Sequence, residues 1–266
     1  MIDDPLGYTG RQVVVTGAAS GMGAATAAIL AGLGATVVAL DVKAIDGPAE
    51  TKLQVDLRDP ASIDRVVKAI DGPVQAVFSV AGLPGAPFSD LDTVLVNFVG
   101  ARHLVEALVP QMPDSGAVVC VGSTAGMGWQ QEIYDLLPFV QTDGFESGRA
   151  WCEAHPERLQ VPYMFSKKAL NAWVAWRAAS LLRQNGIRLN CSNPGPTDTA
   201  MMPAFEAQVG AAMIDAYVGP GGRRSTAEEQ AWPLVFVNSP RASFIAGESF
   251  QVDNGFMAAL LTNQLA

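Results

Sequence analysis

Cysteine and histidine are scarce in this sequence, which has 3 cysteines and 2 histidines among its 266 residues. None of them has the spacing of zinc ligands, which argues against a zinc-dependent catalytic centre, and we expect no metal. The odd number of cysteines indicates free thiols, as found in proteins of a reducing compartment. Cys120 and Cys191 lie in apolar segments and are expected to be core residues.

Basic residues and long apolar segments are also few. The sequence has 17 Lys and Arg against 26 Asp and Glu, a net charge of −9, and its basic residues are scattered. An acidic chain without a basic stripe is a poor candidate for binding nucleic acid or an anionic membrane. No apolar run approaches the ~18–20 residues that span a bilayer, and the first residues lack the features of a signal peptide. We therefore expect a soluble, cytoplasmic protein that binds neither nucleic acid nor membrane.

Apolar residues make up 49% of the sequence and charged residues 16%, which is enough apolar material for a sizeable core. Apolar runs typical of strands alternate with segments of helical spacing. Strands are expected at 12–15, 36–40, 53–57, 74–80, 117–121, 187–192 and 250–252, and helices at 22–33, 60–70, 90–112, 163–184 and from a capping box at 225–228. This alternation predicts one α/β domain over residues 1–266, a doubly wound parallel sheet of the Rossmann type with helices on both faces.

A glycine-rich turn, TGAASGMG at 16–23, follows the first predicted strand directly and opens the first predicted helix. Glycines allow a tight turn and let backbone N–H groups approach a pyrophosphate, and the helix N-terminus adds a favourable dipole. A turn without function is the alternative, but the position between a strand and a helix favours a dinucleotide site. The residues expected to contact the cofactor are Gly17, Ser20, Gly21, Met22 and Gly23.

Asp41 ends the second predicted strand, near the ~20-residue spacing typical of the acid that binds the adenosine ribose. A carboxylate at this point would accept hydrogen bonds from a free 2′-hydroxyl and would repel a 2′-phosphate. Ala19 and Val42 offer no cation for such a phosphate. We therefore expect NAD rather than NADP as the cofactor; the alternative is an aspartate that only caps its turn.

Tyr163 and Lys167 are four residues apart in a predicted helix, so their side chains share a face. A nearby ammonium lowers the pKa of a phenol from its usual ~10. Tyr163 could then take a proton from an alcohol or give one to a carbonyl. The same spacing also occurs by chance, where a ring packs beside a lysine stem.

These motifs together resemble the short-chain dehydrogenase/reductase family, in the subtype marked by TGxxxGxG and YxxxK. The resemblance extends from Thr16 to Gly255. The further segments that carry it are Asp56-Leu57, Ala81-Gly82, Asn97, Gly122-Ser123, Pro194-Gly195 with Thr199, and Asp253-Asn254-Gly255. One departure is Ser79-Val80, which stands where the family has two asparagines.

The resemblance implies four catalytic residues, Asn97, Ser123, Tyr163 and Lys167. Ser123 would hydrogen-bond the substrate oxygen, Lys167 would also hold the nicotinamide ribose, and Asn97 would anchor a water that links Lys167 to solvent. The cofactor contacts it implies, beyond the glycine turn and Asp41, are Asp56, Leu57, Ala81, Gly82, Tyr163, Lys167, Pro194, Gly195, Thr197 and Thr199. It thus implies an NAD-dependent oxidoreductase that interconverts a secondary alcohol and a ketone or aldehyde.

The segment from about 128 to 162 is an insertion, because family members commonly have a much shorter gap between the catalytic serine and tyrosine. Its placement is similar to the insertion in bacterial 3α-hydroxysteroid dehydrogenases and coniferyl-alcohol-dehydrogenase-like members. Residues 148–155 could be helical. We expect the insertion to wall the substrate pocket. The chain is expected to form a homodimer or a homotetramer, and an insertion over the face that the family uses for a four-helix interface would leave a dimer.

The substrate loop is expected at about 196–224, with a helix from 202 to 217. Met201, Met202, Phe205 and Met213 are compatible with two interpretations, an adaptable apolar pocket wall or an ordinary packed helix face. The first predicts a bulky apolar substrate such as a hydroxysteroid, a terpenoid or an aromatic alcohol.

Two other functions remain open. A non-catalytic NAD-binding regulator on the same fold needs the glycine turn but not the pair Tyr163 and Lys167. An epimerase or dehydratase of the extended relatives usually carries TGxxGxxG and a longer C-terminal domain. The presence of the pair and the TGxxxGxG spacing favour the dehydrogenase.

Overall fold

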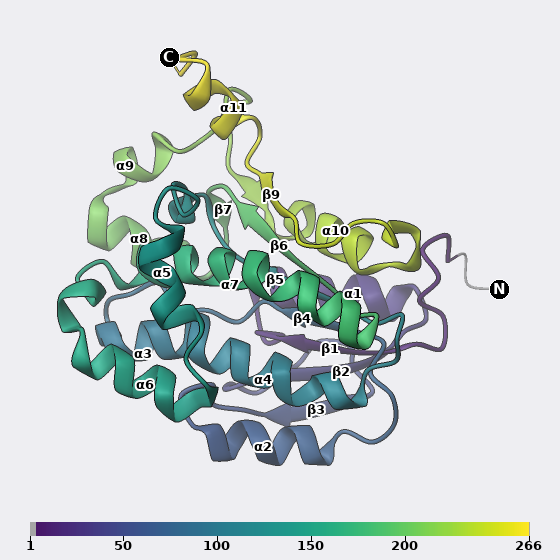
Figure 1. Cartoon of the computed structure of the whole chain (residues 1–266). Helices are drawn as coiled ribbons and strands as arrows, with labels where there is room; N and C mark the ends of the chain where they lie inside the picture. Colours follow the sequence, from purple (N-terminus) through teal and green to yellow (C-terminus); the bar gives the residue numbers. More distant parts are fainter. Residues whose placement is uncertain (1–3, 266) are drawn as a thin grey trace.

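The computed structural model describes residues 4–265 and is built on a seven-stranded parallel sheet (Figure 1). The strand order is β3-β2-β1-β4-β5-β6-β9. From β1 the chain adds strands toward one edge of the sheet and from β4 toward the other edge, as in doubly wound folds. The strands are β1 (Gln12–Thr16), β2 (Thr36–Asp41), β3 (Thr51–Gln54), β4 (Ala76–Ser79), β5 (Ala117–Val121), β6 (Arg188–Pro194) and β9 (Ser249–Val252). The predicted α/β architecture is confirmed.

The central strands are buried along their whole length because helices cover both faces of the sheet. Val13, Val14 and Val15 of β1 are fully buried, as are the residues of β4, β5 and β6. This explains why β1, β4 and β5 are largely apolar, whereas β6 also carries buried polar side chains such as Arg188 and Asn190, which are hydrogen-bonded. The edge strand β3 was predicted to begin two residues and to end three residues too late, since the N–H of Asp56 donates to the Ser62 hydroxyl (3.1 Å) instead of to a neighbouring strand.

Helices lie on both faces of the sheet (Figure 1). Their bounds are α1 (Gly21–Gly32), α2 (Pro60–Ala69), α3 (Asp90–Val94), α4 (Ala101–Leu108), α5 (Ile133–Val140), α6 (Gly144–Ala154), α7 (Pro162–Asn185), α8 (Met202–Val209), α9 (Ala211–Asp215), α10 (Ala227–Asn238) and α11 (Phe256–Leu261). On one face α1 packs against α10, with Leu30 and Leu234 in a shared core. On the other face α2, α4 and α7 contribute Ile63, Leu104 and Leu170 to a second core.

The helix expected at 90–112 is interrupted by a π-helical segment, Leu95–Gly100, between α3 and α4. A Cβ on Gly100 would lie 2.0 Å from the carbonyl oxygen of Leu57, so the helix passes directly against the segment that follows β3. Single π-helical turns are frequent at functional sites. This one carries Asn97, a position that helical spacing in the sequence could not distinguish from an ordinary α-helix.

The insertion forms α5 and α6, so α6 begins earlier than the expected 148–155 and α5 is additional. Its core is the Phe139 ring, whose centre lies 4.8 Å from that of Phe98, 4.5 Å from that of Trp151 and 5.4 Å from that of Phe165. These rings come from the π-helical segment, α6 and α7. The insertion is therefore packed onto the main domain by an aromatic cluster.

The substrate loop was predicted as one helix but is two, because Gly210 adopts a φ of +84° between α8 and α9. A short pair of strands, β7 (Thr197–Asp198) and β8 (Ser225–Thr226), brings the two ends of the loop together. The capping box of α10 is Thr226 with Glu229, one residue later than predicted, because the Ser225 hydroxyl is bonded to the side chains of Thr197 and Gln230 instead.

Within residues 4–265, no helix combines the length and the apolarity that crossing a membrane requires. Over the same part of the chain, no three His, Cys, Asp or Glu side chains are grouped so that they could hold a metal ion. Cys120, Cys152 and Cys191 are buried free thiols.

Candidate active site

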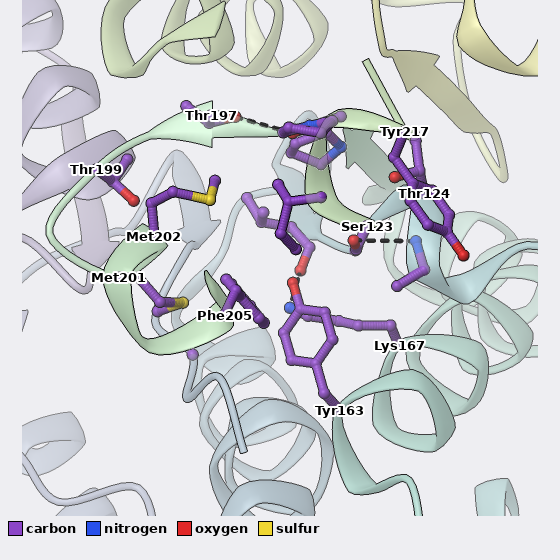
Figure 2. A pocket seen from close by; sticks show the side chains of 18 of the residues that line it. Ser123, Thr124, Tyr163, Lys167, Thr197, Thr199, Met201, Met202, Phe205 and Tyr217 are labelled. Atoms are coloured by element: carbon purple, nitrogen blue, oxygen red, sulfur yellow. Dashed lines mark hydrogen bonds between the residues drawn. The ribbon is translucent and has the colours of Figure 1, made fainter. Parts of the chain in front are cut away.

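A cavity of about 250 Å³ lies beside the carboxyl ends of β5 and β6, which is where open α/β sheets bind their ligands. Figure 2 shows Tyr163, Lys167 and Ser123 on one side of it and the methionines of the substrate loop on another. The lining comes from the ends of β4, β5 and β6, the first turns of α7 and the substrate loop. Its loop residues are Thr197, Thr199, Met201, Met202, Phe205, Val209, Met213, Ile214 and Tyr217. Since Met201, Met202 and Met213 line the cavity, the structure supports the interpretation of these methionines as an apolar pocket wall.

Lys167 is buried in the second turn of α7, with 3% of its surface exposed. Its Nζ donates a hydrogen bond to the carbonyl oxygen of Val121 at the end of β5 (2.7 Å) and lies 5.5 Å from the centre of the Tyr163 ring. Burial lowers the pKa of Lys167 to about 8. The side chain is therefore still mostly charged at neutral pH.

Tyr163 lies in the first turn of α7, which begins with Pro162. Its ring packs edge-on against Phe205 of α8, with the centres 4.8 Å apart. Burial raises the pKa of the phenol above its usual value, and a hydrogen bond with Ser123 offsets part of that rise. The Lys167 ammonium is held at the Val121 carbonyl, 5.5 Å from the centre of the Tyr163 ring, and its predicted lowering of this pKa stays a prediction.

Ser123 lies directly after β5, where it caps a 3-10 turn, Thr124–Gly126. Its Oγ accepts a hydrogen bond from the N–H of Ala125 (3.1 Å), and its own N–H donates to Oδ1 of Asn193 in β6 (3.1 Å). Both the side chain and the backbone of Ser123 are thus positioned by neighbours. The structure brings together Ser123, Tyr163 and Lys167 as the sequence predicted.

Asn97 is buried in the π-helical segment. Its Oδ1 accepts from the N–H of Leu83 (2.7 Å), and its Nδ2 donates to the Leu83 carbonyl (3.0 Å) and to Oγ of Ser166 (3.1 Å). A Cβ on Gly82 would lie 3.2 Å from Asn97 Oδ1 and 3.7 Å from Lys167 Nζ, so these two polar groups face the same glycine. Asn97 therefore holds the segment after β4 close to Lys167.

The backbone geometry of the glycine turn is suited to binding an anion such as a phosphate. Gly17 and Gly21 have φ values of +71° and +54°, and a Cβ on Gly17 would lie 2.9 Å from the Cα of Ala81. A Cβ on Gly23 would lie 2.1 Å from the Gly17 carbonyl, so the turn closes only with glycine there. Ser20 at the N-cap of α1 forms no capping hydrogen bond, and the first turn of α1 has no acidic residue. The first amides of this 12-residue helix therefore have no side-chain cap, which is the arrangement that binds phosphate.

Asp41 and Asp56 lie at the ends of two neighbouring strands and have protein partners. The Asp41 carboxylate accepts from the N–H groups of Ala19 (2.9 Å) and Lys43 (2.9 Å). Asp56 pairs with Arg58 (2.7 Å), whose hydrogen bond holds the pKa of this carboxyl below its usual range. Asp41 thus caps the glycine turn, in agreement with the simpler alternative, and its half-exposed position leaves it open to a ligand as well.

The segment after β6 reaches both parts of the site. Thr197 Oγ1 donates to the Gly195 carbonyl (2.9 Å) and lies 2.9 Å from the Ser225 hydroxyl. Thr199 contacts the glycine turn, since a Cβ on Gly21 would lie 3.4 Å from its side chain. Pro194 and Gly195 line the cavity. Leu57 differs from the other predicted contacts, because its side chain is buried in the core.

The short chain dehydrogenase family model matches residues 11–134, and a model described as enoyl-(acyl carrier protein) reductase matches residues 154–257. A cis-4-hydroxycyclohexanecarboxylate dehydrogenase from Sinomonas cyclohexanicum is 31% identical over 94% of this chain and 98% of its own length. The chain belongs to the short-chain dehydrogenase/reductase family. The two matched segments lie on either side of the insertion, in which neither model matches residues 135–153.

Relatives with the same overall length confirm the subtype of short-chain dehydrogenase/reductase. A coniferyl-alcohol dehydrogenase from a Pseudomonas species is 29% identical over 93% of this chain and 96% of its own. A 3α-hydroxysteroid dehydrogenase/carbonyl reductase from Comamonas testosteroni is 29% identical over 95% and 98%. The crystal structure of a 3α-hydroxysteroid dehydrogenase from Pseudomonas sp. B-0831 with NADH superposes with a TM-score of 0.80 at 29% identity, covering 95% of this chain and 99% of that one.

The expectation that the insertion walls the substrate pocket is wrong for this cavity, none of whose described lining residues comes from 128–162. The aromatic cluster holds the insertion against α7 and the π-helical segment instead. Conversely, the sequence did not point to Tyr217, which lines the cavity and whose ring lies 5.2 Å from that of Phe256 in α11. No motif marks this residue, because only folding brings the chain after α9 next to α11.

Proposed function

We propose that this short-chain dehydrogenase/reductase is an NAD-dependent oxidoreductase that interconverts a secondary alcohol and a ketone or aldehyde. The observation that carries the proposal is the convergence of Tyr163, Ser123 and Lys167 on one apolar cavity beside the glycine turn. The dehydrogenase relatives support it, since they act on alcohols and hydroxysteroids.

Tyr163 is the proposed proton donor and acceptor. In carbonyl reduction its phenol gives a proton to the substrate oxygen, and in alcohol oxidation the phenolate removes that proton. Ser123 also hydrogen-bonds the substrate oxygen and stabilises the charge that develops there. Lys167 holds its positive charge beside the Tyr163 ring and so favours the phenolate once the proton leaves. The side chains of Asn97 and Lys167 both lie next to Gly82. Asn97 is therefore the proposed anchor of a water that conducts protons to and from Lys167.

The residues fit a nicotinamide dinucleotide. The uncapped first turn of α1 and the glycines 17, 21 and 23 would hold the pyrophosphate, together with Ser20 and Met22. Its adenine would lie against Asp56 and the backbone of Leu57. Its nicotinamide half would be surrounded by Ala81, Gly82, Pro194, Gly195, Thr197 and Thr199. When bound, the cofactor would supply or accept the hydride at the substrate carbon.

NAD rather than NADP is the proposed cofactor because of Asp41. Its carboxylate lies at the end of β2, next to the glycine turn that it caps through Ala19. A 2′-phosphate placed there would meet a negative charge, whereas a ribose hydroxyl would meet an acceptor. The NADH complex of the 3α-hydroxysteroid dehydrogenase relative supports this preference.

The proposed substrate is bulky and apolar. The loop side of the cavity consists mainly of methionine, phenylalanine and aliphatic side chains, and among the described residues that line the cavity Lys167 is the only cation. Thioethers adapt to irregular apolar shapes. A hydroxysteroid, a terpenoid or an aromatic alcohol would bury its hydrocarbon against this wall and present one oxygen to Tyr163 and Ser123.

The competing candidate is a non-catalytic NAD-binding regulator. It would keep the glycine turn and need none of the proton-transfer geometry. The decisive experiment measures NADH formation at 340 nm with hydroxysteroids, terpenoid alcohols and aromatic alcohols, and repeats each assay with NADP. Turnover of one class with NAD supports the dehydrogenase. NAD binding without turnover of any class favours the regulator.

A further inference from the structure

Two buried asparagines lie directly behind the catalytic residues. Asn171 is in the third turn of α7 and Asn193 is near the end of β6, with 1% and 2% of their surfaces exposed. Their amides form a reciprocal pair, with Nδ2 of Asn171 donating to Oδ1 of Asn193 (2.9 Å) and Nδ2 of Asn193 donating to Oδ1 of Asn171 (3.1 Å). The pair joins the catalytic helix to the sheet away from solvent.

Each asparagine also bonds to the backbone of a proposed catalytic residue. Oδ1 of Asn193 accepts the N–H of Ser123 (3.1 Å), and Nδ2 of Asn171 donates to the Lys167 carbonyl (2.9 Å). A primary amide has two donor hydrogens and an oxygen with two lone pairs. Asn171 uses both hydrogens, one for Oδ1 of Asn193 and one for the Lys167 carbonyl. Ser123 and Lys167 are thus connected through a single amide pair.

Two glycines make room for this arrangement. A Cβ on Gly122 would lie 2.2 Å from Oδ1 of Asn193, and a Cβ on Gly126 would lie 3.0 Å from Nδ2 of Asn171. These glycines precede and follow the Ser123 turn, so any side chain at either place would displace one amide. The close packing lets the two amides reach the Ser123 N–H and the Lys167 carbonyl.

We infer that Asn171 and Asn193 are positioning residues, which set the distance between Ser123 on the sheet and Tyr163 and Lys167 on α7. The inference rests on the proposed function, since it concerns the same substrate oxygen. Ser123 and Tyr163 must contact one atom together, and misplacement by about 1 Å can reduce a rate on the order of 10²-fold. Buried amide pairs suit this role because each unmade bond would leave a buried polar group unsatisfied.

Isosteric substitutions separate the two halves of the pair. Asn193→Asp keeps the oxygen that accepts from Ser123 and from Asn171 and loses only the bond to Oδ1 of Asn171, so the turn should be disturbed less. Asn171→Asp removes both donors and sets a carboxylate against the Lys167 carbonyl and Oδ1 of Asn193, so the pair should open. Asn238→Asp is the control, because Asn238 is a buried amide that donates to the Val77 carbonyl far from these residues (2.9 Å).

The first readout is hydrogen–deuterium exchange of residues 122–127, measured without cofactor or substrate and therefore independent of the proposed function. Asn171→Asp should accelerate exchange in this segment most, Asn193→Asp should accelerate it less, and Asn238→Asp should leave it unchanged. Equal exchange in all three variants would overturn the inference. So would acceleration in the Asn193→Asp variant alone.

The second readout is kinetic. In Asn171→Asp, kcat should fall on the order of 10²-fold, with KM and the Kd for NADH changed by less than about 3-fold because neither amide lies in the cavity wall. Asn193→Asp should lose less than about 10-fold in kcat. The kcat of each variant is corrected for the fraction of protein that is folded at the assay temperature, taken from its thermal unfolding curve. Equal losses of corrected kcat in the three variants would show that the pair is only structural. Wild-type protein that turns over no substrate would reject the proposed function, while the exchange result would still decide on the positioning.

Discussion

At the residue scale, Tyr163 is the group whose removal should separate chemistry from binding. The Tyr163→Phe variant loses only the phenolic oxygen, while its ring can still pack against Phe205. We expect kcat to fall by about 10²–10⁴-fold, which is the usual contribution of a positioned acid or base. The Kd for NADH, measured by fluorescence titration, should stay within about 3-fold of wild type. Near-normal turnover would remove Tyr163 from the mechanism.

The raised pKa of Tyr163 determines the sign of the pH dependence. Alcohol oxidation needs the phenolate, so kcat/KM for oxidation should rise as pH increases from 6 to 10, whereas carbonyl reduction needs the phenol and should decline only at the alkaline end. Because the bond with Ser123 lowers this pKa, the Ser123→Ala variant should show the oxidation rise at a higher pH. Full pH profiles of both proteins test this. An unshifted profile in Ser123→Ala would mean that the serine does not act on the phenol.

Asp41 is the residue on which cofactor choice is expected to depend. Asp41→Ala removes the negative charge that would oppose a 2′-phosphate, so the ratio of kcat/KM with NAD to that with NADP should fall by at least about 10-fold. Asp46→Ala is a suitable control, since this exposed carboxylate has no hydrogen-bonded partner among the described residues. If the ratio in Asp41→Ala stays at the wild-type value, Asp41 serves only to cap the glycine turn through Ala19.

At the scale of elements, the insertion is connected to the main domain through Arg102 of α4. The buried guanidinium donates to the carbonyls of Val140 (2.9 Å) and Gly144 (2.7 Å) and lies over the Phe98 ring. It therefore caps the C-terminal end of α5 and holds the first residue of α6 through its carbonyl. Glu106, one turn later, pairs with Arg177, which fixes α4 to α7 in the same way.

Arg102→Met should lower the free energy of unfolding by about 2–4 kcal/mol, because it leaves buried carbonyls without donors. The activity of the folded protein should change little, since the insertion does not line the cavity. Urea denaturation is the measurement, with Arg149→Met as the control, because Arg149 forms only an exposed pair with Glu153. A loss of activity that exceeds the loss of folded protein would show that the insertion also acts on the site.

The elements themselves differed in how well they could be predicted. The strands and α1, α2 and α7 were predicted to within a few residues, because apolar periodicity and caps act locally. The π-helical segment and the break at Gly210 were not, since they depend on contacts with distant segments and on one positive φ. The capping box was misplaced by one residue because the Ser225 hydroxyl is bonded to the side chains of Thr197 and Gln230.

At the scale of the whole molecule, the insertion covers part of the face that α4 and α7 would offer for a four-helix interface. Its helix α5 contacts α7, and α6 contacts the π-helical segment. We therefore predict a homodimer. Size-exclusion chromatography with light scattering should give about twice the chain mass of 27.9 kDa. A stable tetramer would mean that the insertion leaves that interface usable.

The sequence by itself determined the sheet, the glycine turn and the identities of Tyr163, Lys167 and Ser123, because those features depend on local spacing and on chemistry that few residue types provide. Only the tertiary structure decided that the Lys167 ammonium bonds to the Val121 carbonyl and that the insertion avoids the cavity. It alone joined Asn171 to Asn193. These are contacts between segments far apart in the chain, and their geometry depends on how helices pack on a sheet, for which no local pattern exists.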